Sequence, residues 1–157
     1  MTRITRGAVA FPGSSLDYKT GSDWGFGGLE TDDPVARGTK LQLPIYGLAA
    51  RSRLGDVPVR AAYWFLNERA RFRQIGYDLD GALDRFHEAI EIIVGGIEAG
   101  SFPARPGDED TRKNSFKNCT FCDFDRICPP ERDREWDRVR PAPELAPYVG
   151  LAEGTPA

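Results

Sequence analysis

Long apolar runs and secretory features are absent from this sequence of 157 residues. No segment approaches the roughly 18 consecutive apolar residues that a membrane-spanning helix needs, so we predict no membrane association. Residues 1–6 contain two arginines, but the apolar stretch of a secretory signal does not follow them. We therefore expect a cytoplasmic protein.

A strong charge of either sign is also absent. The chain has 21 Lys and Arg against 24 Asp and Glu, a formal net charge of −3. Such a balance gives no overall attraction to nucleic acid or to anionic membranes, so a polyanionic partner must be held by a local patch or a metal. Hydrophobic residues make up 40% and charged residues 29%, which is typical of a soluble globular domain.

Cysteine and histidine are scarce, with three and one residues. All three cysteines fall between Cys119 and Cys128, with Cys122 between them, which excludes the evenly paired disulfide framework of a small secreted protein. In a reducing compartment this clustering indicates metal ligation. Three thiolates suit either a tetrahedral zinc or an iron–sulfur cluster, each with a fourth ligand from elsewhere. The lone His87 is far from them in sequence, and we do not assign it as a ligand.

The apolar pattern predicts an α/β domain over residues 1–140, with a cysteine segment at 116–130 and a disordered, proline-rich tail at 141–157. The expected strands are residues 8–11 and 14–18 (a hairpin), 57–66 and 72–77. The expected helices are residues 39–53, 80–99 and 131–140. Residues 20–38, rich in glycine and aspartate, are expected to be a long loop.

The first candidate site is the triplet Asp17-Tyr18-Lys19 in the expected strand 14–18. Residues two apart on a strand face the same way, so Asp17 and Lys19 project together while Leu16 and Tyr18 are expected to face the core. A carboxylate beside an ammonium suits a site where Asp17 binds Mg²⁺ and Lys19 stabilises a pentacovalent phosphate or orients a water. Taken alone, the triplet is better explained as a solvated ion pair on a strand face.

Gln42 and Tyr46 form a second candidate pair, because residues four apart share one face of a helix. An amide and a phenol on one face can hydrogen-bond a phosphodiester. In isolation the pair is better explained as a half-buried tyrosine beside a surface glutamine.

Together these motifs occur in a fixed order along the chain. They are Asp17-Tyr18-Lys19-Thr20-Gly21, then Gly38-Thr39-Lys40-Leu41-Gln42-Leu43-Pro44-Ile45-Tyr46, then Cys-x-x-Cys-x5-Cys. This order resembles the C-terminal nuclease domain of the PD-(D/E)XK superfamily, in particular the RecB/AddB-type helicase–nucleases and the CRISPR-associated Fe–S exonucleases. The resemblance runs from about Ile4 to Val139. It implies a restriction-endonuclease-like fold, a mixed β-sheet flanked by helices, with a C-terminal cysteine-ligated metal segment.

The resemblance also implies roles for individual residues. Asp17 is expected to be a metal ligand, joined by the Tyr18 carbonyl, and Lys19 the catalytic lysine. Gln42 and Tyr46 are expected to line the active site and touch the DNA backbone. The implied ligands of a 4Fe–4S cluster, with zinc as the alternative, are Cys119, Cys122 and Cys128. The implied reaction is hydrolysis of DNA with Mg²⁺ or Mn²⁺, in DNA recombination or repair.

The sequence departs from the family's pattern near its start. Thr2-Arg3-Ile4-Thr5 stands where the family has its first metal-binding carboxylate, which is therefore not found. The nearby carboxylates, none of them marked by a motif, are Asp23, Glu30, Asp32 and Asp33. We expect this chain to be the C-terminal part of such a domain, from a truncated product, a misassigned start or a split protein. The fourth cluster ligand is then expected outside it, and its partners are DNA and a helicase subunit or a missing N-terminal half.

Two alternatives remain at this point. The first is a catalytically inactive DNA- or partner-binding module that retains the fold and the cluster. The second is a zinc-stabilised interaction domain unrelated to nucleases, which leaves the order of the Asp-Tyr-Lys and Gln-x-x-x-Tyr motifs to coincidence.

Overall fold

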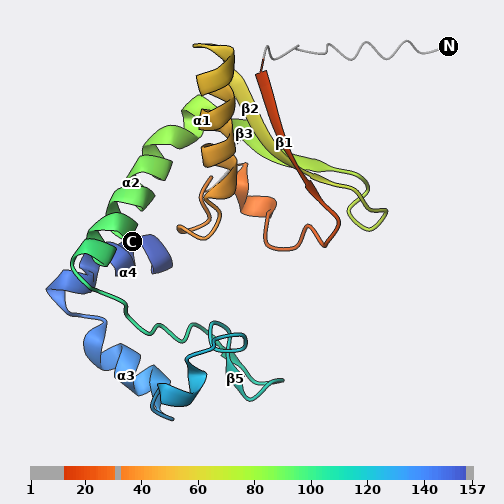
Figure 1. Cartoon of the computed structure of the whole chain (residues 1–157). Helices are drawn as coiled ribbons and strands as arrows, with labels where there is room; N and C mark the ends of the chain where they lie inside the picture. The colour runs from red at the N-terminus through yellow and green to blue at the C-terminus, as the bar shows by residue number, and fades with distance from the viewer. Residues whose placement is uncertain (1–12, 31–32, 155–157) are drawn as a thin grey trace. The chain divides into compact units, whose positions relative to one another are not determined.

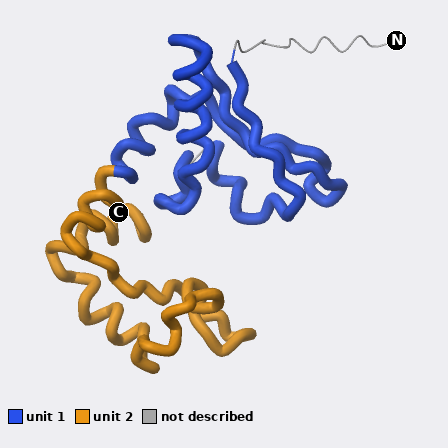
Figure 2. Tube along the Cα trace, viewed as in Figure 1, with its two compact units in different colours: residues 1–90 blue, residues 91–157 orange. Residues whose placement is uncertain are grey.

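The computed structural model describes residues 13–30 and 33–154. The chain divides into two compact units, residues 1–90 and 91–157 (Figure 2). Helix α2 (Leu79–Glu98) begins in the first unit and ends in the second. The sequence pattern predicted one domain over residues 1–140 instead, and its predicted strand at 8–11 lies outside the described residues.

A three-stranded mixed sheet forms the centre of the first unit. Its strands are β1 (Gly13–Lys19), β2 (Val59–Phe65) and β3 (Gln74–Asp78), in the order β1-β2-β3. β1 pairs parallel with β2 through a crossover that contains helix α1 (Gln42–Leu54), and β2 pairs antiparallel with β3 in a hairpin (Figure 1). The expected mixed sheet with flanking helices is thereby confirmed, since alternating apolar residues gave β2 and helical periodicity gave α1 and α2.

The core of this unit lies on one face of the sheet. Ala61, Tyr63 and Phe65 of β2 are almost fully buried there, together with Leu43 of α1 and Leu29 of the short 3-10 helix η1 (Gly27–Leu29). Burial of such side chains stabilises the unit by about 1.5–3 kcal/mol each.

The predicted orientation of β1 was wrong. Leu16 and Tyr18 are 36% and 59% exposed, whereas the Asp17 side chain is only 14% exposed. Helix α1 packs over the face that carries Asp17 and Lys19, and the pleat then turns Leu16 and Tyr18 to the other face.

The buried stripe of α1 also differs from the predicted one. Helical spacing puts Leu41, Ile45, Leu48 and Ala49 on one apolar stripe of the expected helix 39–53, but the buried residues of α1 are Leu43, Pro44 and Gly47. Gly47 explains the change, because a Cβ there would lie 2.9 Å from Cδ1 of Leu79. The glycine lets α1 approach the start of α2 closely, so this side of the helix becomes the packed one.

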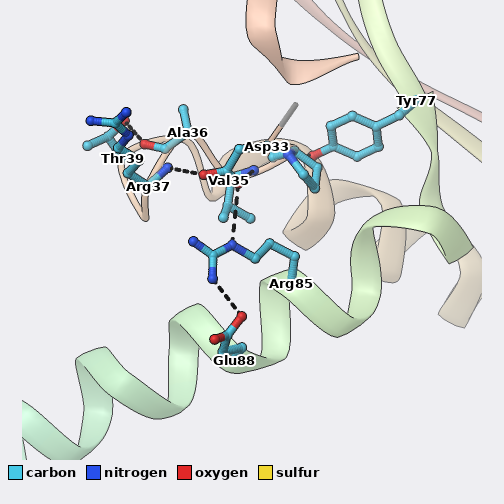
Figure 3. Close-up of polar contacts among 9 residues, drawn as sticks. Asp33, Val35, Ala36, Arg37, Thr39, Tyr77, Arg85 and Glu88 are labelled. Carbon is cyan, nitrogen blue, oxygen red and sulfur yellow. Dashed lines mark hydrogen bonds and ion pairs between the residues drawn. The ribbon is translucent and has the colours of Figure 1, made fainter. Parts of the chain in front are cut away.

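The loop before α1 is organised by one carboxylate (Figure 3). Asp33 accepts hydrogen bonds from the backbone N–H groups of Val35 (3.1 Å) and Arg37 (2.6 Å), and Nε of Arg85 lies 3.6 Å from its Oδ1. Ala36 and Arg37 have φ of +45° and +57°, a left-handed backbone that residues other than glycine adopt rarely. Asp33 therefore holds a tight reversal of the chain that leads directly into α1.

The second unit consists of short elements after α2. They are β4 (Glu109–Asp110), β5 (Ser115–Phe116), η2 (Asp125–Ile127), α3 (Arg132–Val139), η3 (Pro143–Leu145) and α4 (Ala146–Glu153). β4 and β5 form a two-stranded antiparallel sheet. In the described part of the chain, no helix combines the length and apolar character that a membrane crossing requires.

The prediction of a disordered tail was wrong for residues 143–153. Leu151 of α4 is buried, and Trp136 of α3 donates from Nε1 to Glu153 Oε1 at 3.2 Å. Pro143 and Pro147 stand in the first positions of η3 and α4. Proline is favourable there, because the N–H it lacks has no partner within the helix and its fixed φ suits a helix start.

Candidate active site

The structure places Asp17 and Lys19 on one face of β1, under α1. Lys19 Nζ lies 2.9 Å from Asp17 Oδ2 and donates to Gln42 Oε1 at 3.1 Å. The side chains of Lys19 and Asp17 are 30% and 14% exposed. The ammonium is thus held at a fixed position, with one side still open to solvent.

Gln42 and Tyr46 extend this arrangement along the first turns of α1. Gln42 Nε2 donates to Tyr46 Oη at 3.0 Å, and the Tyr46 side chain is exposed. Because the Tyr46 oxygen accepts from the amide, its own hydrogen is available to an acceptor outside the chain. The four side chains proposed from sequence therefore form one continuous contact chain, which we call the Asp17–Tyr46 chain.

Tyr63 of β2 is a member of this site that sequence reasoning placed only in the expected strand 57–66. It lies directly across from Asp17 in the β1–β2 register, and Lys19 Nζ sits 5.0 Å from the centre of its ring. Burial, then the charge of Asp17 and the neighbouring Tyr46, raise the Tyr63 pKa to about 12. Its phenol stays protonated at neutral pH and gives Lys19 an aromatic wall, a cation–π contact. Only the parallel register of β1 and β2 reveals this role.

Asp17 also has the property expected of a cation ligand. Its Oδ2 is buried and makes no hydrogen bond of acceptable geometry, although Lys19 Nζ lies close by. A buried carboxylate oxygen that lacks a hydrogen bond is costly unless another partner satisfies it. Carboxylate oxygen is the donor that Mg²⁺ prefers, so Asp17 fits the metal that the family implies. Tyr18, the other expected ligand, points its side chain to the opposite face, and the role of its carbonyl stays a prediction.

The nearby carboxylates that sequence left open have partners elsewhere. Asp23 pairs with Arg73 at 3.1 Å, Glu30 accepts from the Gly76 N–H at 3.2 Å, and Asp33 holds the loop described above. Asp32 and residues 2–5 lie outside the described residues. Across residues 13–30 and 33–154, no three His, Cys, Asp or Glu side chains are gathered as a metal-binding group.

The three cysteines share one cavity in the second unit. Cys119, Cys122 and Cys128 are free thiols and line a pocket of about 100 Å³ together with Asn118 and Arg132. A turn brings the first two close, since the Cys122 N–H donates to the Cys119 carbonyl at 3.1 Å. Three soft sulfur donors that line one cavity suit, in number and chemistry, three ligands of a zinc or iron–sulfur site. In the described residues the three thiols are not gathered closely enough to form a metal-binding group.

Arg132 of α3 holds the loop that carries these thiols. Its Nε donates to the Pro129 carbonyl at 3.3 Å and its Nη2 to the Asp125 carbonyl at 3.1 Å, while Nη1 lies 2.6 Å from Asp125 Oδ1. Desolvation lowers the pKa of Arg132, but the Asp125 carboxylate and the Cys119 side chain raise it more. The guanidinium is therefore a fixed positive charge beside the thiol cavity.

The fold and the first site define a class of protein. A mixed sheet with a parallel β1–α1–β2 crossover and an Asp-x-Lys pair under the crossover helix is a nuclease-like α/β arrangement. The family model of the PD-(D/E)XK nuclease superfamily matches residues 14–129, and the chain belongs to that superfamily. No curated protein and no solved structure matches the chain.

Proposed function

We propose that this chain is the nuclease domain of a RecB-family helicase–nuclease or exonuclease that hydrolyses DNA phosphodiesters in recombination or repair. The observation that carries the proposal is the Asp17–Tyr46 chain, in which the candidate residues of two distant motifs meet through direct contacts. Family membership supports the nuclease class, and the order of motifs along the chain supports the RecB-type assignment.

The chemistry of the site follows from its residues. Asp17 would hold Mg²⁺ or Mn²⁺, which when bound polarises a phosphate oxygen and lowers the pKa of a water. Lys19 supplies a positive charge where negative charge develops on the phosphorus oxygens, and the Gln42 carbonyl keeps its ammonium aimed there. Tyr46 donates its outward hydrogen to a backbone phosphate. Water attacks the phosphorus, and one phosphodiester P–O bond breaks.

The test is hydrolysis of end-labelled DNA by the full chain with Mg²⁺ or Mn²⁺ and with EDTA. We expect cleavage that requires the metal and stops on its removal. Equal traces of cleavage under all conditions contradict hydrolysis and favour the alternative, an inactive DNA- or partner-binding module. That alternative has one observation in its favour, because Asp17 is the one carboxylate that the described residues place at Lys19.

We further propose that Cys119, Cys122 and Cys128 bind a 4Fe–4S cluster, with zinc as the alternative and the fourth ligand outside this chain. Three observations support the proposal: the shared cavity, the absence of disulfides among the three thiols, and the Arg132 charge beside Cys119. Anaerobic purification is expected to give absorbance near about 400 nm with iron and sulfide in equal amounts. A colourless protein with one zinc contradicts the cluster.

Replacement of Arg132 by alanine is expected to lower metal occupancy of the cysteine site by about tenfold or more, since groups that orient metal ligands contribute on this scale. The loop loses its two carbonyl anchors, and the cavity loses one of the two arginines that line it. Arg134→Ala, an exposed arginine on the same helix, is the matched control. Metal content by mass spectrometry checks the result, and equal occupancy in both variants refutes it.

A further inference from the structure

Four aromatic side chains near the end of β1 and the β2–β3 turn take no part in the hydrolytic site. Tyr18, Trp24 and Phe72 are 59%, 82% and 56% exposed, and Trp64 is partly exposed. The rings of Tyr18 and Trp64 lie 5.8 Å apart, and Trp64 Nε1 donates to the Phe72 carbonyl at 3.0 Å. We call these four residues the aromatic platform.

The platform is tied to the end of β1 that carries Lys19. The Leu66 N–H donates to the Lys19 carbonyl at 2.7 Å, and Asn67 Nδ2 donates to the Gly21 carbonyl at 2.8 Å. An ion pair of 3.1 Å joins Asp23 to Arg73, the residues next to Trp24 and Phe72. The turn between β2 and β3 is therefore fastened to the loop after β1. The platform lies at the end of β1 that carries Lys19, with Tyr18 and Trp64 on the face of the sheet opposite to Asp17 and Lys19.

Two residues of this turn have an unfavourable backbone conformation. Arg71 and Phe72 have φ of +51° and +52°, and both are exposed. Glycine adopts this conformation without cost, whereas other residues do not. The Phe72 ring is held on this backbone with more than half of its surface open to solvent.

Positive charge borders the same turn. Arg69 and Arg71 are exposed, and neither forms an ion pair with any residue that the structure describes. Glu68 is the exposed carboxylate of this turn, and Arg73 already neutralises Asp23. Exposed rings bordered by free guanidinium groups are complementary to bases joined by phosphates.

We propose that the aromatic platform binds single-stranded nucleic acid by stacking unpaired bases on Trp24 and Phe72, with Arg69 and Arg71 on the phosphates. The inference rests on the proposed function, because it takes the bound strand to pass around β1, which is an edge strand of the sheet, to the Asp17–Tyr46 chain on the other face. A duplex hides the faces of its bases inside the stack, so these rings offer it little. Single strands present a π-face at every base, and stacking is tolerant of sequence.

The experiment measures binding without hydrolysis. Fluorescence anisotropy in EDTA compares a labelled oligothymidylate with a duplex of equal length, each titrated with the full chain. We expect tighter binding of the single strand, and about tenfold weaker binding for Phe72→Gly and for Trp24→Ala. Phe72→Gly removes the ring while it relaxes the backbone, so its melting temperature is expected to equal or exceed that of the unmodified chain. Phe102→Ala, 76% exposed in the second unit, is the matched control and is expected to bind normally.

Three outcomes overturn the inference. The first is an affinity for single-stranded DNA that is equal in all variants, and the second is a preference for the duplex. The third is a set of variants that change only self-association, because the platform is then a contact between copies of the chain or with another protein. Loss of cleavage in Mg²⁺ with platform-dependent binding intact contradicts the proposed hydrolysis alone. Cleavage with binding that ignores the platform contradicts this inference alone.

Discussion

Replacing Lys19 with methionine is expected to lower DNA hydrolysis by about 10²- to 10³-fold, the usual loss when one group that stabilises transition-state charge is removed. Methionine keeps most of the unbranched aliphatic stem but removes the ammonium, which contacts Asp17, Gln42 and the Tyr63 ring at once. The bound phosphate then meets the negative charge of Asp17 without a compensating cation. The loss is expected in kcat rather than in DNA affinity, because the charge matters most where negative charge develops.

Single-turnover cleavage in Mg²⁺, together with DNA affinity in EDTA, separates these two effects. Lys40→Met is the matched control in the same unit, since Lys40 stands over the Phe26 ring at 4.1 Å and outside the site. A Lys19→Met chain that cleaves as well as the Lys40→Met chain removes Lys19 from the mechanism. Equal melting temperatures exclude unfolding as the cause of any loss.

The largest effect on stability is expected from Gly76→Ala. A Cβ at Gly76 would lie 2.1 Å from the Ala61 carbonyl oxygen and 2.5 Å from Cα of Ala62, both of them backbone atoms of β2. These atoms cannot move without opening the β2–β3 pairing, in which Gly76 lies opposite Ala62. We expect a loss of about 3 kcal/mol or more in the free energy of unfolding, at the upper end for overpacking.

Thermal and urea unfolding measure this change. In a unit of this size, about 3 kcal/mol corresponds to a fall in melting temperature of roughly 15 °C. Gly81→Ala is the opposite case, because a Cβ there meets nothing within 4 Å inside α2, and it is expected to stabilise the chain by about 0.5–1 kcal/mol. Unfolding of Gly76→Ala close to that of the unmodified chain contradicts the packing argument.

Much of the first unit could be predicted from sequence because local patterns determine it. The alternation of Val59, Ala61, Tyr63 and Phe65 gave β2, and apolar spacing gave α2. The two motifs Asp-x-Lys and Gln-x-x-x-Tyr gave the residues that the fold brings together. Their functional roles remain predictions that the experiments above test.

The predictions that were wrong concerned features set by long-range contacts, which local sequence patterns do not contain. Alternation assigns Leu16 and Asp17 to opposite faces of β1, but only the position of α1 decides which face is covered. The proline content of residues 141–157 suggested disorder, although proline also starts helices, as Pro143 and Pro147 do. Tyr63 belongs to the site because the β1–β2 register places it opposite Asp17, and this register is a long-range property of the fold.

The amide of Gln42 gives the Asp17–Tyr46 chain a direction. Lys19 can only donate, so the Gln42 oxygen must face it, and the amide nitrogen must then face Tyr46. With this orientation the Tyr46 hydroxyl, at the outer end, keeps a hydrogen to donate, although Asp17, at the inner end, is an acceptor. The positive charge of Lys19 thus fixes the orientation of Gln42, and through it leaves the Tyr46 hydroxyl at the surface as a hydrogen-bond donor for a phosphate. Glutamate, which has nearly the same shape, would reverse the last step, because its carboxylate would require the Tyr46 hydrogen to turn inward.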